Sequence, residues 1–170
     1  MILHPAGRVV VFSIVAIIGA TLLLPGPNSS AGPLPAPSAD APSSANDACA
    51  LLTPADIAKA AGLKVGAGTA GKPMPGILGK CTWTGEGNTG VIVTLTDAQH
   101  MQITMSAVEH GGKAVPDIGS KAVGIKQAAF VGGYIVWVLD ANGGFGASVF
   151  GKNGTLEQAI AVAKMVESRR

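Results

Sequence analysis

Residues 125–150 read IKQAAFVGGYIVWVLDANGGFGASVF and predict three consecutive β-strands. The apolar runs 125–131, 134–139 and 145–150 are separated by Gly132-Gly133 and Asn142-Gly143, pairs that are typical of hairpin turns. We expect an antiparallel meander. Both faces of the run 134–139 are apolar, so we expect this strand to be central and covered on both sides.

Two further strands are predicted on the N-terminal side of the meander. Residues 81–84 and 91–96 alternate in polarity and are joined through the glycine-containing segment 85–90. Residues 66–79 carry five glycines and two prolines, so we expect a long loop there. The prediction is an antiparallel sheet of about five strands.

Three helices are predicted from residues that commonly cap helix N-termini. Thr53, followed by a proline, begins a short helix that ends before Gly62. Asp97 begins a second helix, in which apolar residues recur at helical spacing. Thr155 and Gln158 form a capping box for the last helix. Helices packed on an antiparallel sheet make an α+β fold.

The N-terminal part of the chain predicts export. Arg8 precedes an apolar run over 9–24, and residues 1–31 are typical of a signal peptide with a mature N-terminus at Gly32. The run has 16 residues, shorter than the roughly 20 that span a bilayer, and retention as an anchor is the alternative. Residues 32–48 are rich in Pro, Ala and Ser and predict a disordered linker. Residues 49–170 then form a single domain.

Charge argues against a nucleic-acid partner. The chain has a formal net charge of +2 and only 13% charged residues. Because no stripe of basic residues is present to neutralise phosphates, we expect no nucleic acid to bind.

One segment matches the spacing of a phosphate-binding loop. Gly66 to Lys72 fits GxxxxGK. Such a loop must lead into a helix and carry Ser or Thr after the lysine, whereas Pro73 follows here. We therefore expect a flexible loop and no nucleotide cofactor.

No catalytic or metal-binding residues are predicted. Ser148 lies within a predicted strand and lacks the turn of a serine nucleophile. His100 and His110 are ten residues apart rather than at the four-residue spacing of helical metal ligands, so both are expected at the surface. Asp117 is expected to form a turn.

The large aromatic side chains are candidates for a binding surface. Trp83 and Tyr134 lie beside polar or loop residues, so partial exposure would make them available to a ligand or partner. The alternative is that both fill the core. Trp137 alternates with Ile135 and Leu139 and is expected to be buried.

The two cysteines predict a disulfide. Cys49 and Cys81 are an even pair in a chain that is predicted to enter an oxidising compartment. Their spacing is not that of a CxxC redox or metal site. The bond would tie the start of the first helix to the first predicted strand.

Several short motifs resemble a family of exported domains of unknown function, which are common in actinobacterial envelope proteins, many of them lipoproteins. The motifs are CALLTPADI at 49–57, Gly62, CTW at 81–83 and VPDIGSKA at 115–122. The resemblance implies a cysteine pair and an envelope location, and it brings no active site. No cysteine follows the apolar run closely, which departs from the lipoprotein members.

Together these observations predict a secreted or envelope domain that acts as a non-enzymatic binding or interaction module. Its partner would be an envelope protein or a small ligand, with membrane contact only if the N-terminal segment is retained. The alternatives are a hydrolase-like enzyme without a recognisable motif and a structural accessory protein.

Overall fold

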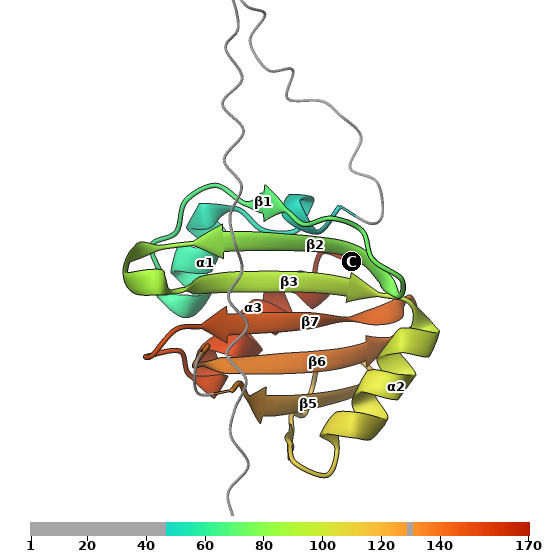
Figure 1. The fold of residues 1–170 in the computed structure, drawn as a ribbon. Helices are drawn as coiled ribbons and strands as arrows, with labels where there is room; N and C mark the ends of the chain where they lie inside the picture. Colours follow the sequence, from blue (N-terminus) through green and yellow to red (C-terminus); the bar gives the residue numbers. More distant parts are fainter. Residues whose placement is uncertain (1–46, 129–130) are drawn as a thin grey trace, which may run out of the picture. The chain divides into compact units, whose positions relative to one another are not determined.

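A seven-stranded antiparallel sheet forms the centre of the protein in a computed structural model that describes residues 47–128 and 131–170 (Figure 1). The strand order is β1-β2-β3-β7-β6-β5-β4, so β7 is the middle strand. The α+β class is confirmed, with more strands than predicted. The strands are β1 Thr69–Ala70, β2 Ile77–Thr84, β3 Gly90–Thr96, β4 Lys113–Ala114, β5 Lys121–Lys126, β6 Tyr134–Asp140 and β7 Gly143–Phe150.

The additional strands are the short β1 and β4, which lie at the two edges of the sheet. β1 falls within segment 66–79, predicted to be a loop, and β2 begins at Ile77 rather than at Cys81. A strand of two residues has no alternation to detect in the sequence. Short edge strands also leave few unpaired backbone groups, which protects the sheet from pairing with another chain.

The predicted meander is confirmed, because β5, β6 and β7 pair consecutively. The first of these strands is shifted, since β5 covers 121–126 rather than 125–131. Ala128 O accepts hydrogen bonds from Val131 N and Gly132 N, both at 2.9 Å, so Ala128 begins a turn instead of continuing the strand. Residues 129 and 130 lie outside the described part of the chain.

The helix starts agree with the predicted caps. Thr53 and Asp56 form a capping box at α1, Asp97 accepts from His100 N at α2, and Thr155 and Gln158 form a second capping box at α3. The helices are α1 Pro54–Ala61, α2 Ala98–Val108 and α3 Leu156–Glu167, with 3-10 turns η1 Ala48–Ala50 and η2 Glu86–Asn88.

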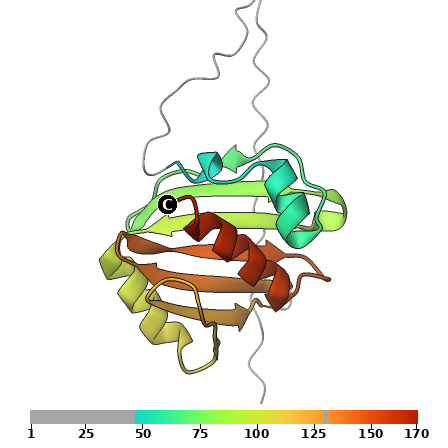
Figure 2. The same cartoon turned by 180° about the vertical axis from the view of Figure 1, so that it is seen from behind.

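The main core lies between the sheet and the helices α1 and α3, which lie together on one face (Figure 2). Alternate residues of the strands point into this core and are fully buried. The largest of the buried side chains are those of Ile57, Trp83, Val91, Val93, Leu95, Val136, Val138, Phe145, Val149, Val162 and Val166.

The opposite face of the sheet carries α2 at one end only (Figure 1). Met101 and Met105 of α2 pack there on Val123, with Trp137 at the margin of the cluster. Trp137 is half-buried, so the prediction that it is buried was wrong. The Trp137 ring lies over Gly146, where an added Cβ would be 2.6 Å from the ring. Helix α2 covers only part of the Trp137 side chain.

The ordered elements start before the predicted boundary at Cys49, because Asp47 caps η1. Ala48 is 2% exposed and begins η1, so the end of the predicted linker 32–48 belongs to the domain. The predicted signal peptide 1–31 and the rest of the linker lie outside the described residues. None of the helices in the described ranges has the length and apolar character needed to cross a membrane.

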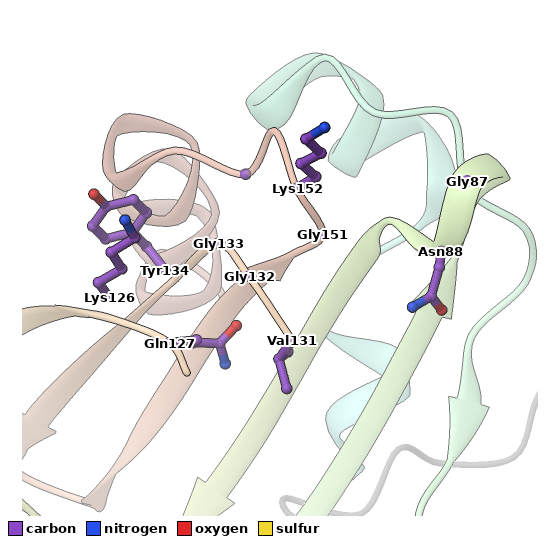
Figure 3. A pocket seen from close by; sticks show the side chains of 11 residues that line it. Gly87, Asn88, Lys126, Gln127, Val131, Gly132, Gly133, Tyr134, Gly151 and Lys152 are labelled. Atoms are coloured by element: carbon purple, nitrogen blue, oxygen red, sulfur yellow. The ribbon is translucent and has the colours of Figure 1, made fainter. Parts of the chain in front are cut away.

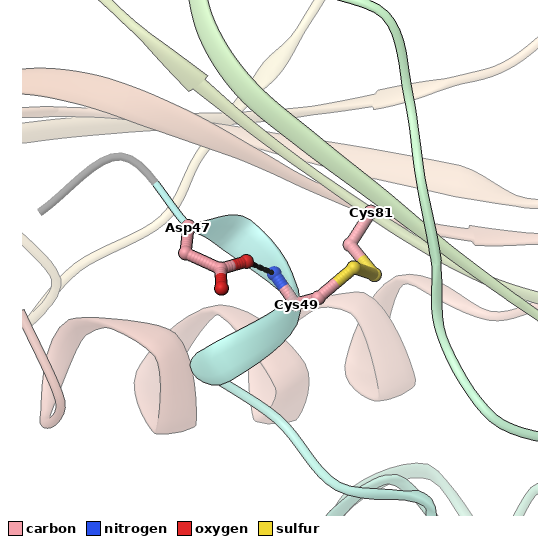
Figure 4. The surroundings of a disulfide bond; sticks show 3 residues. All are labelled: Asp47, Cys49 and Cys81. Atoms are coloured by element: carbon pink, nitrogen blue, oxygen red, sulfur yellow. Dashed lines mark hydrogen bonds between the residues drawn. A yellow bond between two sulfur atoms is a disulfide. The ribbon is translucent and has the colours of Figure 1, made fainter. Parts of the chain in front are cut away.

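The predicted disulfide between Cys49 and Cys81 is confirmed (Figure 4). It joins η1 to β2 across a sequence separation of 32 residues, with the two Cα atoms 5.0 Å apart. The side chain of Asp47 accepts a hydrogen bond of 2.9 Å from Cys49 N, which caps η1. The bond therefore holds the first turn of the domain against the sheet.

Candidate functional site

The two aromatic residues predicted to form a binding surface are not brought together. Trp83 is 1% exposed and belongs to the core, so for this residue the alternative of a core side chain holds and it cannot form a binding surface. Cys81 points inward to meet Cys49, and Trp83, two residues further along β2, points to the same side. Gly68 lies directly against both side chains, because an added Cβ would be 2.7 Å from Cys81 Sγ and from Trp83 Nε1.

Tyr134 is half-buried and lines a cavity of about 750 Å³ (Figure 3). It is the first residue of β6 and pairs in register with Lys126, the last residue of β5. We call this cavity the Tyr134 pocket. The residues that line it are Gly87, Asn88, Lys126, Gln127, Val131, Gly132, Gly133, Tyr134, Gly151, Lys152 and Gly154.

Three chain connections at one end of the sheet build the Tyr134 pocket. They are η2 between β2 and β3, the connection between β5 and β6, and segment 151–155 between β7 and α3. The strand order β3-β7-β6-β5 places these connections side by side, at the end of the sheet opposite to α2 (Figure 1). Residues far apart in the sequence therefore meet in one cavity.

Glycines allow the backbones of these connections to approach closely. Gly133 has φ of 80°, and a Cβ there would be 2.0 Å from Val149 O. Gly151 has φ of 110° and lies against Thr89. Gly151 N donates to Val131 O at 3.2 Å, which links two of the connections. Because positive φ and contacts this close both require glycine, the sequence specifies these walls of the pocket.

The lining side chains carry several polar groups. Lys126 and Lys152 are exposed and lie apart from each other in the lining, and Gln127 lies between Lys126 and Val131 (Figure 3). The Oε1 atom of Gln127 is buried and has no hydrogen-bond partner within residues 47–128 and 131–170. A buried acceptor without a donor costs about 1 to 3 kcal/mol. A donor group on a bound molecule would remove this cost.

A second cavity of about 610 Å³ adjoins the Tyr134 pocket and shares Lys126, Tyr134 and Gly154 with it. Lys113 of β4 and Glu157 in the first turn of α3 also line this second cavity. Hydrogen bonds from the backbone N–H of Glu157 and from the side chain of Thr155 lower the pKa of the Glu157 carboxyl, and Lys113 adds to the effect. The Glu157 carboxyl is thus ionised at neutral pH.

The histidines and the acid considered from the sequence do not assemble into a site. His110 is exposed, whereas His100 is half-buried with its ring against Gly76, at the other end of α2. Asp117 is exposed with φ of 62°, in agreement with the predicted turn. Within the described residues, no three side chains of His, Cys, Asp or Glu are close enough to hold a metal ion.

Ser148 lies within β7, as the sequence predicted for that position. The residue is 2% exposed, and its Oγ atom has no hydrogen-bond partner in the described part of the chain. The hydroxyl is thus enclosed by the sheet rather than presented to a substrate.

Segment 66–72, with the spacing of a phosphate-binding loop, leads into a strand rather than a helix. It contains β1, which pairs antiparallel with β2, and Lys72 is exposed. Met74 then forms a bridge with Ile77, the first residue of β2. The helix N-terminus that such a loop needs to hold a phosphate does not follow this segment.

Sequence patterns point to Tyr134 but not to Lys126, Gln127 or Lys152. The signal that points to them is the density of glycines in 132–133 and 151–154, which marks connections that approach each other closely. Comparison of the chain with known protein families, with curated proteins and with solved structures finds no match. The predicted family and location therefore stay predictions, and the Tyr134 pocket is the basis for a functional proposal.

Proposed function

We propose that this protein is an exported, non-enzymatic binding module that takes a small polar molecule into the Tyr134 pocket. The observation that carries the proposal is the buried Oε1 atom of Gln127, which has no partner among the described residues and lines the same cavity as Tyr134. Ligand sites are concave and combine aromatic or apolar side chains with a small number of polar groups, and Tyr134 and Gln127 are two such residues in this lining.

The size and construction of the pocket support binding. Its volume of about 750 Å³ lies within the range of roughly 300 to 1,000 Å³ that is usual for small-molecule sites. Backbone hydrogen bonds and the contact of Gly133 with Val149 O hold its walls in place. A cavity that is already formed loses little conformational entropy when a ligand enters.

The proposed location outside the cytoplasm is supported by the disulfide of Cys49 and Cys81. Disulfides persist mainly in oxidising compartments. The predicted signal peptide 1–31 is the other support, and it rests on the sequence alone.

The test is a ligand screen on the full-length, oxidised protein. Polar small molecules are added, and chemical-shift changes are followed in residues 126–134 and 151–154. We expect a ligand that shifts these residues and binds more weakly to Gln127→Leu and Tyr134→Phe. Ile103→Ala, at an exposed residue of α2, is the control and should bind like the wild type.

Two outcomes would contradict the proposal. Ligands that bind elsewhere and ignore both pocket variants would favour a structural accessory role or another site. Chemical conversion of the bound molecule, followed by NMR over hours, would favour the enzyme alternative.

A further inference from the structure

We infer that the protein docks on an anionic lipid surface through an exposed apolar patch at the α2 end of the sheet. The patch consists of Met74, Leu78 and Ile103, and we call it the Met74 patch. It shares no residue with the lining of the Tyr134 pocket, which lies at the other end of the sheet. The inference therefore does not rest on the proposed function.

The Met74 patch gathers the large hydrophobic side chains that are exposed in the described part of the chain. Met74 and Ile103 are each 63% exposed, and Leu78 is 39% exposed. Single exposed hydrophobic residues are normal on a protein surface, whereas a group of them marks a site of contact with a protein or a membrane. What carries weight here is that all three lie around one contact between two elements.

That contact joins the turn before β2 to the start of α2, which lie beside each other at one end of the sheet (Figure 1). An added Cβ on Gly76 would be 2.4 Å from Nδ1 of His100, and Asp97 N donates a hydrogen bond of 3.2 Å to Gly76 O. Ile103 follows His100 by three residues, and residues at this spacing are neighbours on a helix surface. Ile103 is therefore one helical turn from the contact.

The turn brings Met74 and Leu78 to the same place. Ile77 N donates to Met74 O at 2.9 Å, and these two residues form a β-bridge. Leu78 follows directly in β2. Pro73 and Pro75 fix the backbone φ on both sides of Met74, so little backbone freedom is left to lose when the Met74 side chain enters another phase.

Two lysines border the Met74 patch. Lys72 and Lys80 are exposed, and neither forms a salt bridge within residues 47–128 and 131–170. An added Cβ on Gly71 would be 3.1 Å from the Lys80 side chain, so Lys80 lies beside the segment that carries Lys72. Residues 62–85 include no Asp or Glu. The turn therefore combines exposed apolar side chains with unneutralised positive charge.

Helix α2 adds no charge that would oppose this pattern. Its sequence contains no Asp, Glu, Lys or Arg, and Gln99 and Gln102 are exposed beside Ile103. Most surface helices carry charged residues on the side that faces water. The acid at the start of α2 is Asp97, which is half-buried and whose side chain accepts a hydrogen bond of 2.7 Å from His100 N.

These features fit an anionic bilayer surface better than a second protein. Apolar side chains enter the boundary between headgroups and acyl chains, while lysines beside them attract the lipid phosphates. A protein interface covers roughly 800 Å² of each partner, more than the exposed parts of three side chains provide. Residues 25–46 join the apolar run 9–24 to the described domain, and a chain of this length reaches at most about 75 Å. A retained run would hold the domain within this reach of the bilayer, where a weak contact is sufficient.

The test is cosedimentation with vesicles of phosphatidylcholine, with and without phosphatidylglycerol. The oxidised protein begins at Gly32, the predicted mature N-terminus, because the apolar run 9–24 would bind lipid by itself. Every residue that the structure describes is kept. We expect sedimentation with the vesicles that contain phosphatidylglycerol, and we expect it to weaken as salt is added.

Substitutions separate the apolar contribution from the charge. Met74→Gln and Ile103→Gln remove apolar area without changing charge and should each weaken the partition about tenfold. Lys72→Gln and Lys80→Gln should each weaken it about fivefold, the effect of about 1 kcal/mol per lysine. Lys59→Gln, at an exposed lysine of α1, is the matched control and should bind like the wild type. Unchanged urea midpoints show that the variants are folded.

Three outcomes would overturn the inference, and none of them affects the proposed function. If the protein sediments with neither vesicle, or equally with both, an anionic lipid is not its partner. If the lysine variants weaken binding but Met74→Gln and Ile103→Gln do not, the attraction is general and no docking occurs at the Met74 patch. A dimer in sedimentation velocity that Met74→Gln abolishes, without vesicle binding, would assign the patch to a second copy of the chain.

Discussion

Arg169, two residues beyond the end of α3, binds both carboxylate oxygens of Asp56 in α1. Its Nη1 and Nη2 atoms each donate a hydrogen bond of 2.7 Å, one to Oδ2 and one to Oδ1. Asp56 also accepts from Thr53 N at 2.8 Å and completes the capping box of α1. One carboxylate therefore stabilises the start of α1 and the position of the C-terminal segment.

The first prediction concerns the pH dependence of this contact. The hydrogen bond from Arg169, and then those from Thr53, hold the pKa of Asp56 well below its ordinary value of about 4. A lowered acid pKa stabilises the fold at pH values above the pKa of the unfolded chain, and this stabilisation is lost as the pH falls. Arg169→Gln should therefore lower the urea midpoint more at pH 7 than at pH 2.5.

Lys164→Gln is the control for that experiment, because Lys164 is an exposed residue of α3, the helix just before Arg169, and forms no salt bridge within the described residues. It should shift the midpoint little at either pH. A loss for Arg169→Gln that is equal at pH 7 and pH 2.5 would show that the ionised carboxylate of Asp56 is not the partner that matters.

The second prediction concerns the disulfide. By the chain-entropy relation, closing a loop of this length contributes about 3 to 4 kcal/mol to the free energy of unfolding. Cys49→Ser should lower that free energy by about this amount and leave Cys81 as a free thiol. Thiol titration of the denatured, unreduced wild type should detect no reactive cysteine, and two reactive thiols would refute the bond.

The third prediction tests the wall of the Tyr134 pocket. Gly133→Ala places a Cβ 2.0 Å from Val149 O in a residue with φ of 80°. Gly62→Ala is a matched control, because Gly62 has φ of 68° and an added Cβ would meet no atom within 4 Å. Both variants carry the cost of positive φ, about 1 kcal/mol.

Only Gly133→Ala adds the clash, so its urea midpoint should fall further and its ligand binding should weaken. Equal midpoints for the two variants would mean that the connection between β5 and β6 adjusts without cost. In that case the walls of the pocket are less fixed than the contacts indicate.

The sequence predicted the strand pairing better than it predicted the exposure of the two tryptophans. Cys81 must point inward to reach Cys49, and the alternation of β2 then buries Trp83, so this outcome could have been deduced from the disulfide. Trp137 offered no such constraint. Apolar residues occupy both faces of β6. The position of α2 decides how much of the face that carries Trp137 is covered.

The pocket was harder to predict because its residues come from three separate connections. Asn88, Lys126 and Lys152 are brought together by the strand order β3-β7-β6-β5, in which β7 is inserted beside β3. Local sequence patterns predict the hairpin β2–β3 and the meander β5–β6–β7. They do not predict that these two units pair through β3 and β7. Tyr134 was identified because it directly follows the glycine pair 132–133, at the start of a predicted strand.

The last prediction concerns Ser148, whose hydroxyl is enclosed in the sheet. The residue is 2% exposed, and its Oγ atom has no hydrogen-bond partner in the described residues. A buried hydroxyl without a partner is unfavourable, so Ser148→Ala should be neutral or should stabilise the fold by up to about 1 kcal/mol. Ser120→Ala is the contrasting variant, because the Ser120 hydroxyl donates to Leu139 O at 3.0 Å and its loss should destabilise the fold by about 1 kcal/mol. Urea unfolding at pH 7 measures both, and a clear loss of stability in Ser148→Ala would mean that this hydroxyl has a bonded partner after all.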